Sequence, residues 1–262
     1  MELKNKVILV TGGSKGIGLG ISEYLAKTGA TVILTSRTHA TAAQTADNIR
    51  KRNPDCKISG FSFDLEDPSS MKRLIAETVA QYGRLDSVVN NAVSKSILVP
   101  IASGEDALID SSITANISSV VKLCKYAYPH LKVTRGSIVN ITSSITKRYI
   151  NNLPLYAMAK TAIARLTEAL AADWAADGIR LNAVNPGFTR SSAFEDLGLS
   201  KEQVSSAYKY FSGFQPLGIA EPGDIAPIVG ILISDLGLKI TGSVFDIDGG
   251  HHIQGHPAMP PA

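Results

Sequence analysis

Short apolar runs alternate with amphipathic segments from one end of the chain to the other. The runs are rich in Val, Ile and Leu and lie at 6–11, 31–35, 57–63, 85–89, 137–141, 179–184 and 244–248. Runs that are apolar at nearly every position are typical of strands buried on both faces. Helical spacing or composition fills the stretches between them, for example at 40–52, 104–131, 155–176 and 224–234. The pattern predicts a doubly wound α/β fold with a seven-stranded parallel Rossmann-type sheet, helices on both faces and right-handed crossovers. No linker or repeat interrupts it, so we expect a single domain over 1–262.

A glycine-rich turn joins the first predicted strand to the first predicted helix. It reads Gly12-Gly13-Ser14-Lys15-Gly16-Ile17-Gly18, and Ile21, Tyr24 and Leu25 continue at helical spacing. Glycines let the backbone turn tightly and approach a pyrophosphate, and the free N–H groups of a helix N-terminus attract that anion. Because the turn stands between a strand and a helix, it predicts dinucleotide binding.

The loop after the second predicted strand discriminates between the two nicotinamide dinucleotides. Its sequence is Ser36-Arg37-Thr38-His39, with no acidic residue to bind a ribose 2′-hydroxyl. Arg37, with Lys15 of the glycine turn, supplies two cations that would face a 2′-phosphate. The loop therefore predicts NADP(H), unless both side chains are merely solvated.

Tyr156 and Lys160 are the candidate catalytic pair. They are four residues apart in an Ala- and Leu-rich stretch, so both lie on one face of a predicted helix that Pro154 begins and Gly178 ends. A neighbouring ammonium favours a phenolate and is expected to lower the pKa of Tyr156 towards neutrality. Ser143 follows the strand at 137–141, and its hydroxyl could hold a substrate oxygen beside Tyr156. The alternative is a partly buried ring beside a solvated amine.

The predicted site residues share one position in the fold. The glycine turn, Arg37, Asn91, Ser143 and the Pro186-Gly187 turn each follow a predicted strand. Chemistry in open parallel sheets gathers at the carboxyl ends of the strands, so these segments should meet there.

Composition excludes several other classes of protein. Hydrophobic residues make up 44% of the chain, charged residues 19%, and the net charge is +3 with Lys and Arg scattered, so we expect no nucleic-acid partner. The two cysteines, Cys56 and Cys124, have no metal-binding spacing and suggest a reducing compartment. The N-terminus does not resemble a signal peptide, and no apolar run is long enough to span a membrane. We therefore expect a cytoplasmic protein with no metal and no membrane partner.

Together these motifs resemble those of the short-chain dehydrogenase/reductase family over nearly the whole chain. Thr11-Gly12-x-x-x-Gly16-x-Gly18 resembles its cofactor turn and Asn90-Asn91-Ala92 its Asn-Asn-Ala-Gly motif. The resemblance implies the catalytic residues Asn116, Ser143, Tyr156 and Lys160. It implies cofactor contacts from Gly12, Ser14, Lys15, Gly16, Ile17, Gly18, Arg37, Asp64, Leu65, Asn91, Ala92, Tyr156, Lys160, Pro186, Gly187, Thr189 and Ser191.

The chain departs from the family pattern at two positions. Val93 replaces the last glycine of Asn-Asn-Ala-Gly, adding bulk and disfavouring a positive φ. Asp177 stands before Gly178, where many reductases of carrier-protein-bound acyl chains have a basic residue. This acid weakens a β-ketoacyl reductase interpretation.

The resemblance implies hydride transfer between a nicotinamide and a carbonyl or secondary alcohol. Tyr156 would donate the proton, Ser143 would polarise the carbonyl, Lys160 would lower the pKa of Tyr156 and bind the nicotinamide ribose, and Asn116 would position a water. Alternatives are a β-ketoacyl reductase acting on carrier-bound chains and a non-catalytic NADP(H) sensor. The aromatic-rich segment 190–215, with Phe194, Tyr208, Tyr210, Phe211 and Phe214, is a substrate flap or a peripheral packing unit. The tail 251–262 is expected to frame the site or a partner interface. The family also implies a homo-oligomer, a tetramer or dimer.

Overall fold

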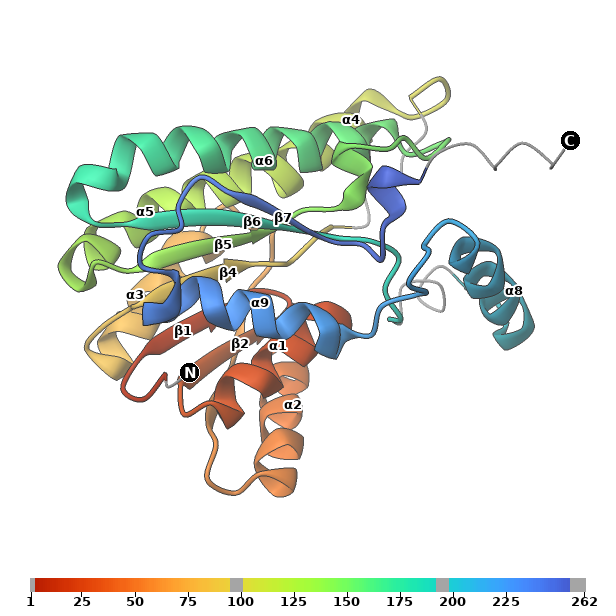
Figure 1. Ribbon diagram of the computed structural model, residues 1–262. Helices are drawn as coiled ribbons and strands as arrows, with labels where there is room; N and C mark the ends of the chain where they lie inside the picture. The colour runs from red at the N-terminus through yellow and green to blue at the C-terminus, as the bar shows by residue number, and fades with distance from the viewer. Residues whose placement is uncertain (1–2, 95–100, 192–197, 255–262) are drawn as a thin grey trace, which may run out of the picture.

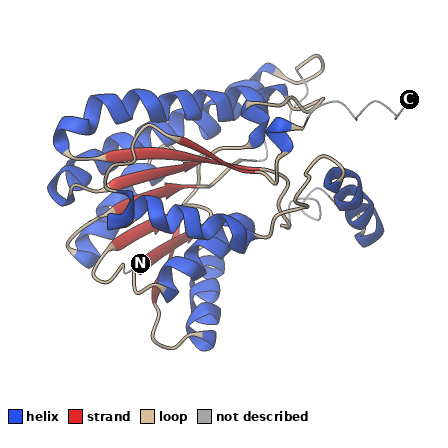
Figure 2. Ribbon diagram, viewed as in Figure 1, coloured by secondary structure: helices blue, strands red, loops and turns tan. Residues whose placement is uncertain are grey.

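A parallel sheet forms the centre of the molecule, with helices on both of its faces (Figure 1, Figure 2). The computed structural model describes residues 3–94, 101–191 and 198–254. The sheet has seven strands in the order β3-β2-β1-β4-β5-β6-β7, and every neighbouring pair is parallel. The strands are β1 Val7–Val10, β2 Thr31–Ser36, β3 Lys57–Ser62, β4 Ser87–Asn90, β5 Ser137–Ile141, β6 Arg180–Pro186 and β7 Val244–Ile247. This order confirms the predicted doubly wound fold.

Two apolar cores lie on opposite faces of the sheet. One face is covered by α1 (Gly16–Lys27), α2 (His39–Arg52) and α9 (Pro222–Ile233), and the other by α3 (Ser70–Tyr82), α5 (Ser119–Thr134) and α6 (Pro154–Trp174). In β1, Ile8 and Val10 point into the first core, whereas Val7 and Leu9 point into the second. Since successive strand residues face opposite sides, a strand that is buried on both faces is apolar at nearly every position.

The helical segment predicted over 104–131 is divided in the structure. α4 (Asp106–Ile113) leads into a π-helical turn, Thr114–Ser118, and α5 follows directly. Asn116 lies in this turn, and its side-chain amide donates to the carbonyl oxygen of Ser112 (3.0 Å). Such side-chain bonds compete with the helix's own ladder, and π-helical turns occur often at functional sites.

The segment 190–215 contains a helix that its composition did not predict. α8 (Lys201–Ser212) stands apart from the sheet (Figure 1), and a capping box between Ser200 and Gln203 begins it. The ring of Phe211 stacks on Phe188 with the centroids 3.9 Å apart. Phe194, within 192–197, and residues 255–262 of the tail lie outside the described residues.

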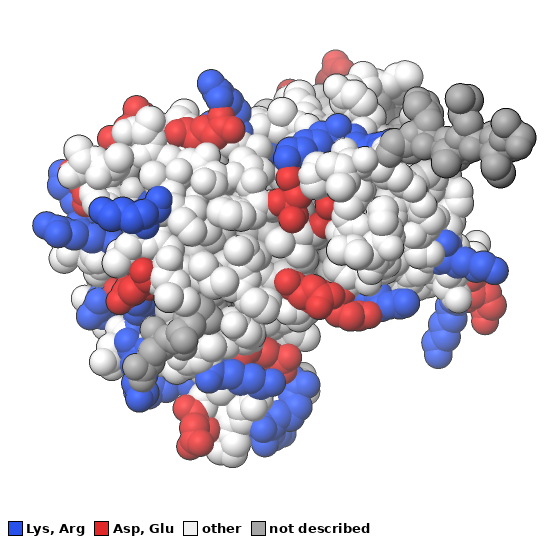
Figure 3. Space-filling model, viewed as in Figure 1, with Lys and Arg blue, Asp and Glu red and all other residues white. Residues whose placement is uncertain are grey.

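The charged side chains are dispersed on the face shown in Figure 3, where Lys and Arg alternate with Asp and Glu. Neither sign gathers into a broad patch on that face. No helix within the described ranges is both long enough and apolar enough to cross a membrane.

Candidate active site

The carboxyl ends of β4 and β5 and the first turns of α6 bring the predicted catalytic side chains together. Pro154 occupies the first turn of α6, as predicted, and Ser143 follows β5. Tyr156 and Lys160 lie one turn apart on α6, and the hydroxyl of Tyr156 shares a hydrogen bond with Ser143. The Lys160 Nζ atom lies 5.8 Å from the centroid of the Tyr156 ring and donates to the carbonyl oxygen of Ile141 (2.8 Å). Tyr156, Ser143 and Lys160 therefore form one cluster, as the sequence predicted.

The titration of this cluster differs from the sequence-based expectation. Burial raises the pKa of the Tyr156 phenol, while the hydrogen bond with Ser143 lowers it by a smaller amount. Burial also lowers the pKa of Lys160 to about 8. The prediction that Lys160 lowers the pKa of Tyr156 is wrong for the protein without its cofactor. The Lys160 ammonium points to the Ile141 carbonyl, and desolvation disfavours both the phenolate of Tyr156 and the ammonium of Lys160. Near neutral pH, Tyr156 therefore carries its proton.

Asn116 lies beside this cluster and not out in solvent. It is 7% exposed, and its Oδ1 atom accepts from the backbone N–H of Ser94 (2.8 Å). A cavity of about 10 Å³ separates Asn116 from Lys160 and is lined by Asn90, Ala92, Val93, Asn116, Val120, Ile141, Ala159, Lys160 and Ile163. That volume is near the smallest that holds one water molecule.

Val93 fits this site without backbone strain. Within the described ranges, the non-glycine residues with positive φ are Asn5, Arg135 and Asn152. The backbone at Val93 therefore does not need the conformation that the usual glycine would supply. The side chain is 50% exposed and contributes to the cavity wall.

The glycine turn packs closely against the end of β4. A Cβ atom on Gly18 would lie 2.2 Å from the carbonyl oxygen of Gly12 and 2.5 Å from Nδ2 of Asn91. The Asn91 amide donates to the carbonyl oxygens of Thr11 (3.0 Å) and Gly12 (3.2 Å), which ties this turn to β4. No acidic residue occupies the first turn of α1, so the helix N-terminus keeps its partial positive charge.

The two predicted phosphate-binding cations lie on the surface near this turn. Lys15 has an extended backbone immediately before α1, and Arg37 follows β2. Both are exposed, and Arg37 forms no ion pair with any residue that the structure describes. The turn leaves no room for a side chain at Gly18, the N-terminus of α1 carries a partial positive charge, and two cations lie exposed nearby. These features together suit the binding of the phosphates of a dinucleotide.

The remaining predicted cofactor residues reach the same edge from separate segments. Gly16 has φ of +54°, and a Cβ atom on it would lie 3.2 Å from Cβ of Ser191. Gly187 follows β6, and its N–H donates to the Ile247 carbonyl oxygen, while Thr189 pairs with Ala220 in an isolated bridge. Asp64 and Leu65 follow β3; the Asp64 carboxylate accepts from the N–H of Glu66 (3.0 Å), and Leu65 is buried. Ser14 and Ile17 are partly buried in the glycine turn, and Ala92 packs against the core beside α5.

Several buried polar residues outside the predicted set of site residues hold these loops in place. The Thr11 hydroxyl accepts from the N–H groups of Asn91 (3.0 Å) and Ala92 (3.1 Å), and that of Thr35 accepts from Gly12 N–H (3.1 Å). The Gln215 amide, 1% exposed, bonds both backbone groups of Phe188 and so joins the 186–191 turn to the flap. The threonines stand at strand ends, a signal that was readable, whereas the contact of Gln215 is set by the tertiary fold.

The C-terminal segment also reaches this edge. The Nδ1 atom of His251 lies 3.0 Å from the Oγ atom of Ser144, and the ring centroids of His251 and Phe188 are 5.5 Å apart. Burial lowers the pKa of His251, with Arg148 adding to the effect. The described part of the predicted tail thus lies beside the Ser143 loop.

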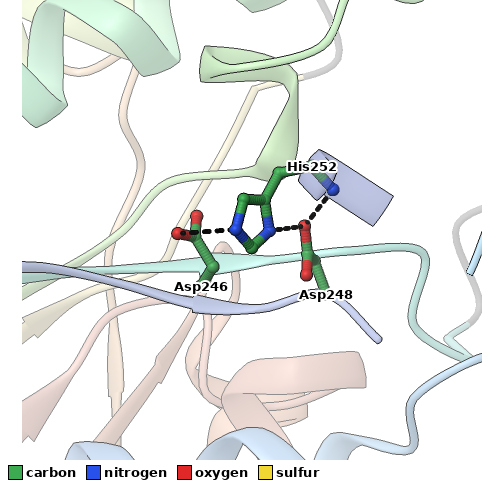
Figure 4. Close-up of side chains that lie close together, drawn as sticks. All are labelled: Asp246, Asp248 and His252. Carbon is green, nitrogen blue, oxygen red and sulfur yellow. Dashed lines mark hydrogen bonds and ion pairs between the residues drawn. The ribbon is translucent and has the colours of Figure 1, made fainter. Parts of the chain in front are cut away.

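Asp246, Asp248 and His252 form a separate polar cluster at the end of β7 (Figure 4). His252 Nδ1 lies 2.8 Å from Asp248 Oδ2, and its Nε2 lies 3.7 Å from Asp246 Oδ2. Asp246 also pairs with Lys147 and Asn185, and Asp248 accepts from the N–H groups of Gly250 and His252. Through these bonds the two carboxylates anchor the 249–252 turn, which follows β7.

Comparisons with known proteins agree with this geometry. A family model described as short chain dehydrogenase matches residues 6–202. A 3alpha-hydroxysteroid dehydrogenase of Mediterraneibacter gnavus is 32% identical over 252 residues, which cover 95% of this chain and 98% of that protein. The chain belongs to the short-chain dehydrogenase/reductase family.

This short-chain dehydrogenase/reductase has further relatives that it matches over nearly their whole length. A 3-oxoacyl-[acyl-carrier-protein] reductase of Thermotoga maritima is 31% identical over 264 aligned positions, covering 95% of this chain and 99% of that one. A short-chain dehydrogenase/reductase of unknown function from Caenorhabditis elegans, solved with its cofactor, superposes with a TM-score of 0.88 at 26% identity and covers 97% of both chains. The protein is thus an oxidoreductase of a family that uses a nicotinamide cofactor.

Proposed function

We propose that this short-chain dehydrogenase/reductase is an NADP(H)-dependent carbonyl reductase, which in reverse oxidises a secondary alcohol. The observation that carries the proposal is the cluster of Tyr156, Ser143 and Lys160 beside the glycine turn. Residues Asn116, Ser143, Tyr156 and Lys160 are its proposed catalytic set.

Each side chain has a role that its environment supports. When bound, the reduced nicotinamide supplies a hydride to the carbonyl carbon. Tyr156, whose pKa is raised by burial, stays protonated near neutral pH and donates its proton to the carbonyl oxygen. Ser143 already shares a hydrogen bond with Tyr156, so its hydroxyl is placed to bond the same substrate oxygen.

Lys160 restores the proton of Tyr156 and would hold the ribose of the cofactor. Its pKa of about 8 lets it gain and lose a proton close to physiological pH. A water in the cavity that Asn116 lines would connect Lys160 to further proton donors. Lys15 and Arg37 would hold a 2′-phosphate, which favours NADP(H) over NAD(H).

The experiment compares Tyr156→Phe with Tyr82→Phe as a matched control. With NADPH and a panel of ketones, Tyr156→Phe should lower kcat by about 10²–10⁴ while NADPH affinity stays within about twofold, because only the acid is removed. Tyr82 bonds Ser59 near the β3 edge of the sheet, so Tyr82→Phe should keep full activity. Full activity of Tyr156→Phe would refute the assignment of the acid.

A β-ketoacyl reductase is the second candidate, favoured by the Thermotoga relative. Asp177, the residue before Gly178, weakens this second candidate. Its carboxylate pairs with Lys132 (2.7 Å) and accepts a hydrogen bond from Tyr128. A carboxylate therefore stands where the acidic surface of a carrier protein would need a cation. Comparing kcat/KM for a free ketone with the same group on pantetheine and on carrier protein separates the two candidates. A preference of tenfold or more for the carrier-bound form, about 1.4 kcal/mol, would favour the second.

A further inference from the structure

A chain of buried side-chain hydrogen bonds runs from α6 to the end of β4. The Thr167 hydroxyl donates to the Ile163 carbonyl oxygen (2.8 Å) and accepts from Asn140 Nδ2 (2.8 Å). Asn140 Oδ1 accepts from Asn90 Nδ2 (2.7 Å). Thr167 and Asn140 are fully buried and Asn90 is 6% exposed.

The direction of this chain fixes the orientation of the Asn90 amide. The Ile163 carbonyl can only accept, so the Thr167 hydroxyl must donate to it and accept from the amide nitrogen of Asn140. Asn140 then presents its oxygen to Asn90, and Asn90 must present its nitrogen in return. The Asn90 oxygen is therefore the free end, and it finds no partner among the residues that the structure describes.

An unpaired buried carbonyl oxygen costs about 1–3 kcal/mol unless it accepts a hydrogen bond. Asn90 lines the same small cavity as Lys160 and Asn116. At about 10 Å³ this cavity has room for about one water, and Lys160 has N–H donors beyond the one that it gives to Ile141.

We propose that Asn90 is a positioning residue that holds a buried water against Lys160. The water donates to Asn90 Oδ1 and accepts from the Lys160 ammonium, so the Thr167–Asn140–Asn90 chain orients the first water of the proton path. The link to catalysis rests on the proposed function, whereas the bound water does not.

The structural arm of the test is a high-resolution crystal structure of the wild-type protein and of Asn90→Leu. We expect one ordered water within about 3.2 Å of Asn90 Oδ1 in the wild type and none at that place in Asn90→Leu, which has a similar volume but no acceptor. A wild-type structure without that water would overturn the proposal, whatever the activity.

The kinetic arm compares Asn90→Leu with Thr78→Val, which removes a buried hydroxyl on α3 that bonds the Leu74 carbonyl oxygen, outside this chain. Asn90→Leu should lower kcat about tenfold, leave KM for NADPH within about twofold and change the pH dependence of kcat, since the water no longer serves Lys160. Thr78→Val should lower thermal stability but keep kcat and its pH profile. A wild-type profile in Asn90→Leu, or an equal loss of kcat in Thr78→Val, would overturn the positioning role. Loss of turnover in Tyr156→Phe is independent of either result, so failure of this inference leaves the proposed function testable.

Discussion

Replacing Lys160 with Met should stabilise the folded protein while it abolishes catalysis. Lys160 is a partly exposed residue whose ammonium donates to the Ile141 carbonyl oxygen and is desolvated enough to lower its pKa from the ordinary 10.5 to about 8. Below pH 8 the side chain is charged in both the folded and the unfolded chain, and the folded state bears the full desolvation cost. Methionine fills a similar volume without a charge.

The magnitude follows from the pKa difference. A fall from 10.5 to about 8 corresponds to about 3 kcal/mol of unfavourable free energy in the folded state. Partial exposure reduces this figure, and the variant also leaves the Ile141 carbonyl without its donor, which costs about 1–3 kcal/mol. We expect a net stabilisation of up to about 1 kcal/mol at pH 7.

The pH dependence of the free energy of unfolding tests the sign of the desolvation effect, whatever the net difference in stability at pH 7. Between pH 8 and 10.5 the unfolded chain keeps the Lys160 proton and the folded chain releases it, so wild-type stability rises with pH by up to about 1.4 kcal/mol per pH unit. The variant lacks this term. The stability advantage of the variant should therefore shrink as the pH rises through 8 and reverse by about pH 9.

Urea unfolding of both proteins, followed by fluorescence of the single tryptophan, Trp174, measures this difference from pH 6 to 9. Lys72→Met, on the exposed surface of α3, is the control and should stay within about 0.5 kcal/mol of the wild type at every pH. A variant less stable than the wild type at pH 7, with a free-energy gap that does not change up to pH 9, would refute the desolvation of Lys160.

Two further predictions concern the cofactor. Gly18→Ala places a Cβ 2.2 Å from the Gly12 carbonyl oxygen, so it should raise the Kd for NADPH at least tenfold and lower stability by about 1–3 kcal/mol. Gly223→Ala is the control, because a Cβ there meets nothing within 4 Å, and it should change neither quantity. Titration with NADPH measures the Kd, and thermal melts measure the stability. Arg37→Asp combined with Lys15→Ala should lower the NADPH-to-NADH ratio of kcat/KM at least tenfold, since charge-assisted bonds contribute about 1.5–3 kcal/mol each. An unchanged ratio would show that neither cation binds a 2′-phosphate.

The amino-acid sequence by itself determined the sheet, its layers and the edge at which the site lies. Strands buried on both faces are apolar at nearly every position, so β1, β2 and β5 could be located within one or two residues of their bounds. Parallel strands place their carboxyl ends together, so Ser143 and the glycine turn had to share one edge. These inferences succeed because they depend on periodicity and chain direction alone.

Only the tertiary structure decided how the site titrates and which polar groups support it. The pKa values of Tyr156 and Lys160 depend on desolvation and on where the ammonium points, and the sequence spacing gave the wrong direction for Tyr156. The orientation and the free oxygen of Asn90 are set by hydrogen bonds that join β4, β5 and α6. Burial and hydrogen-bond direction are properties of surroundings assembled from distant segments, so no local pattern encodes them.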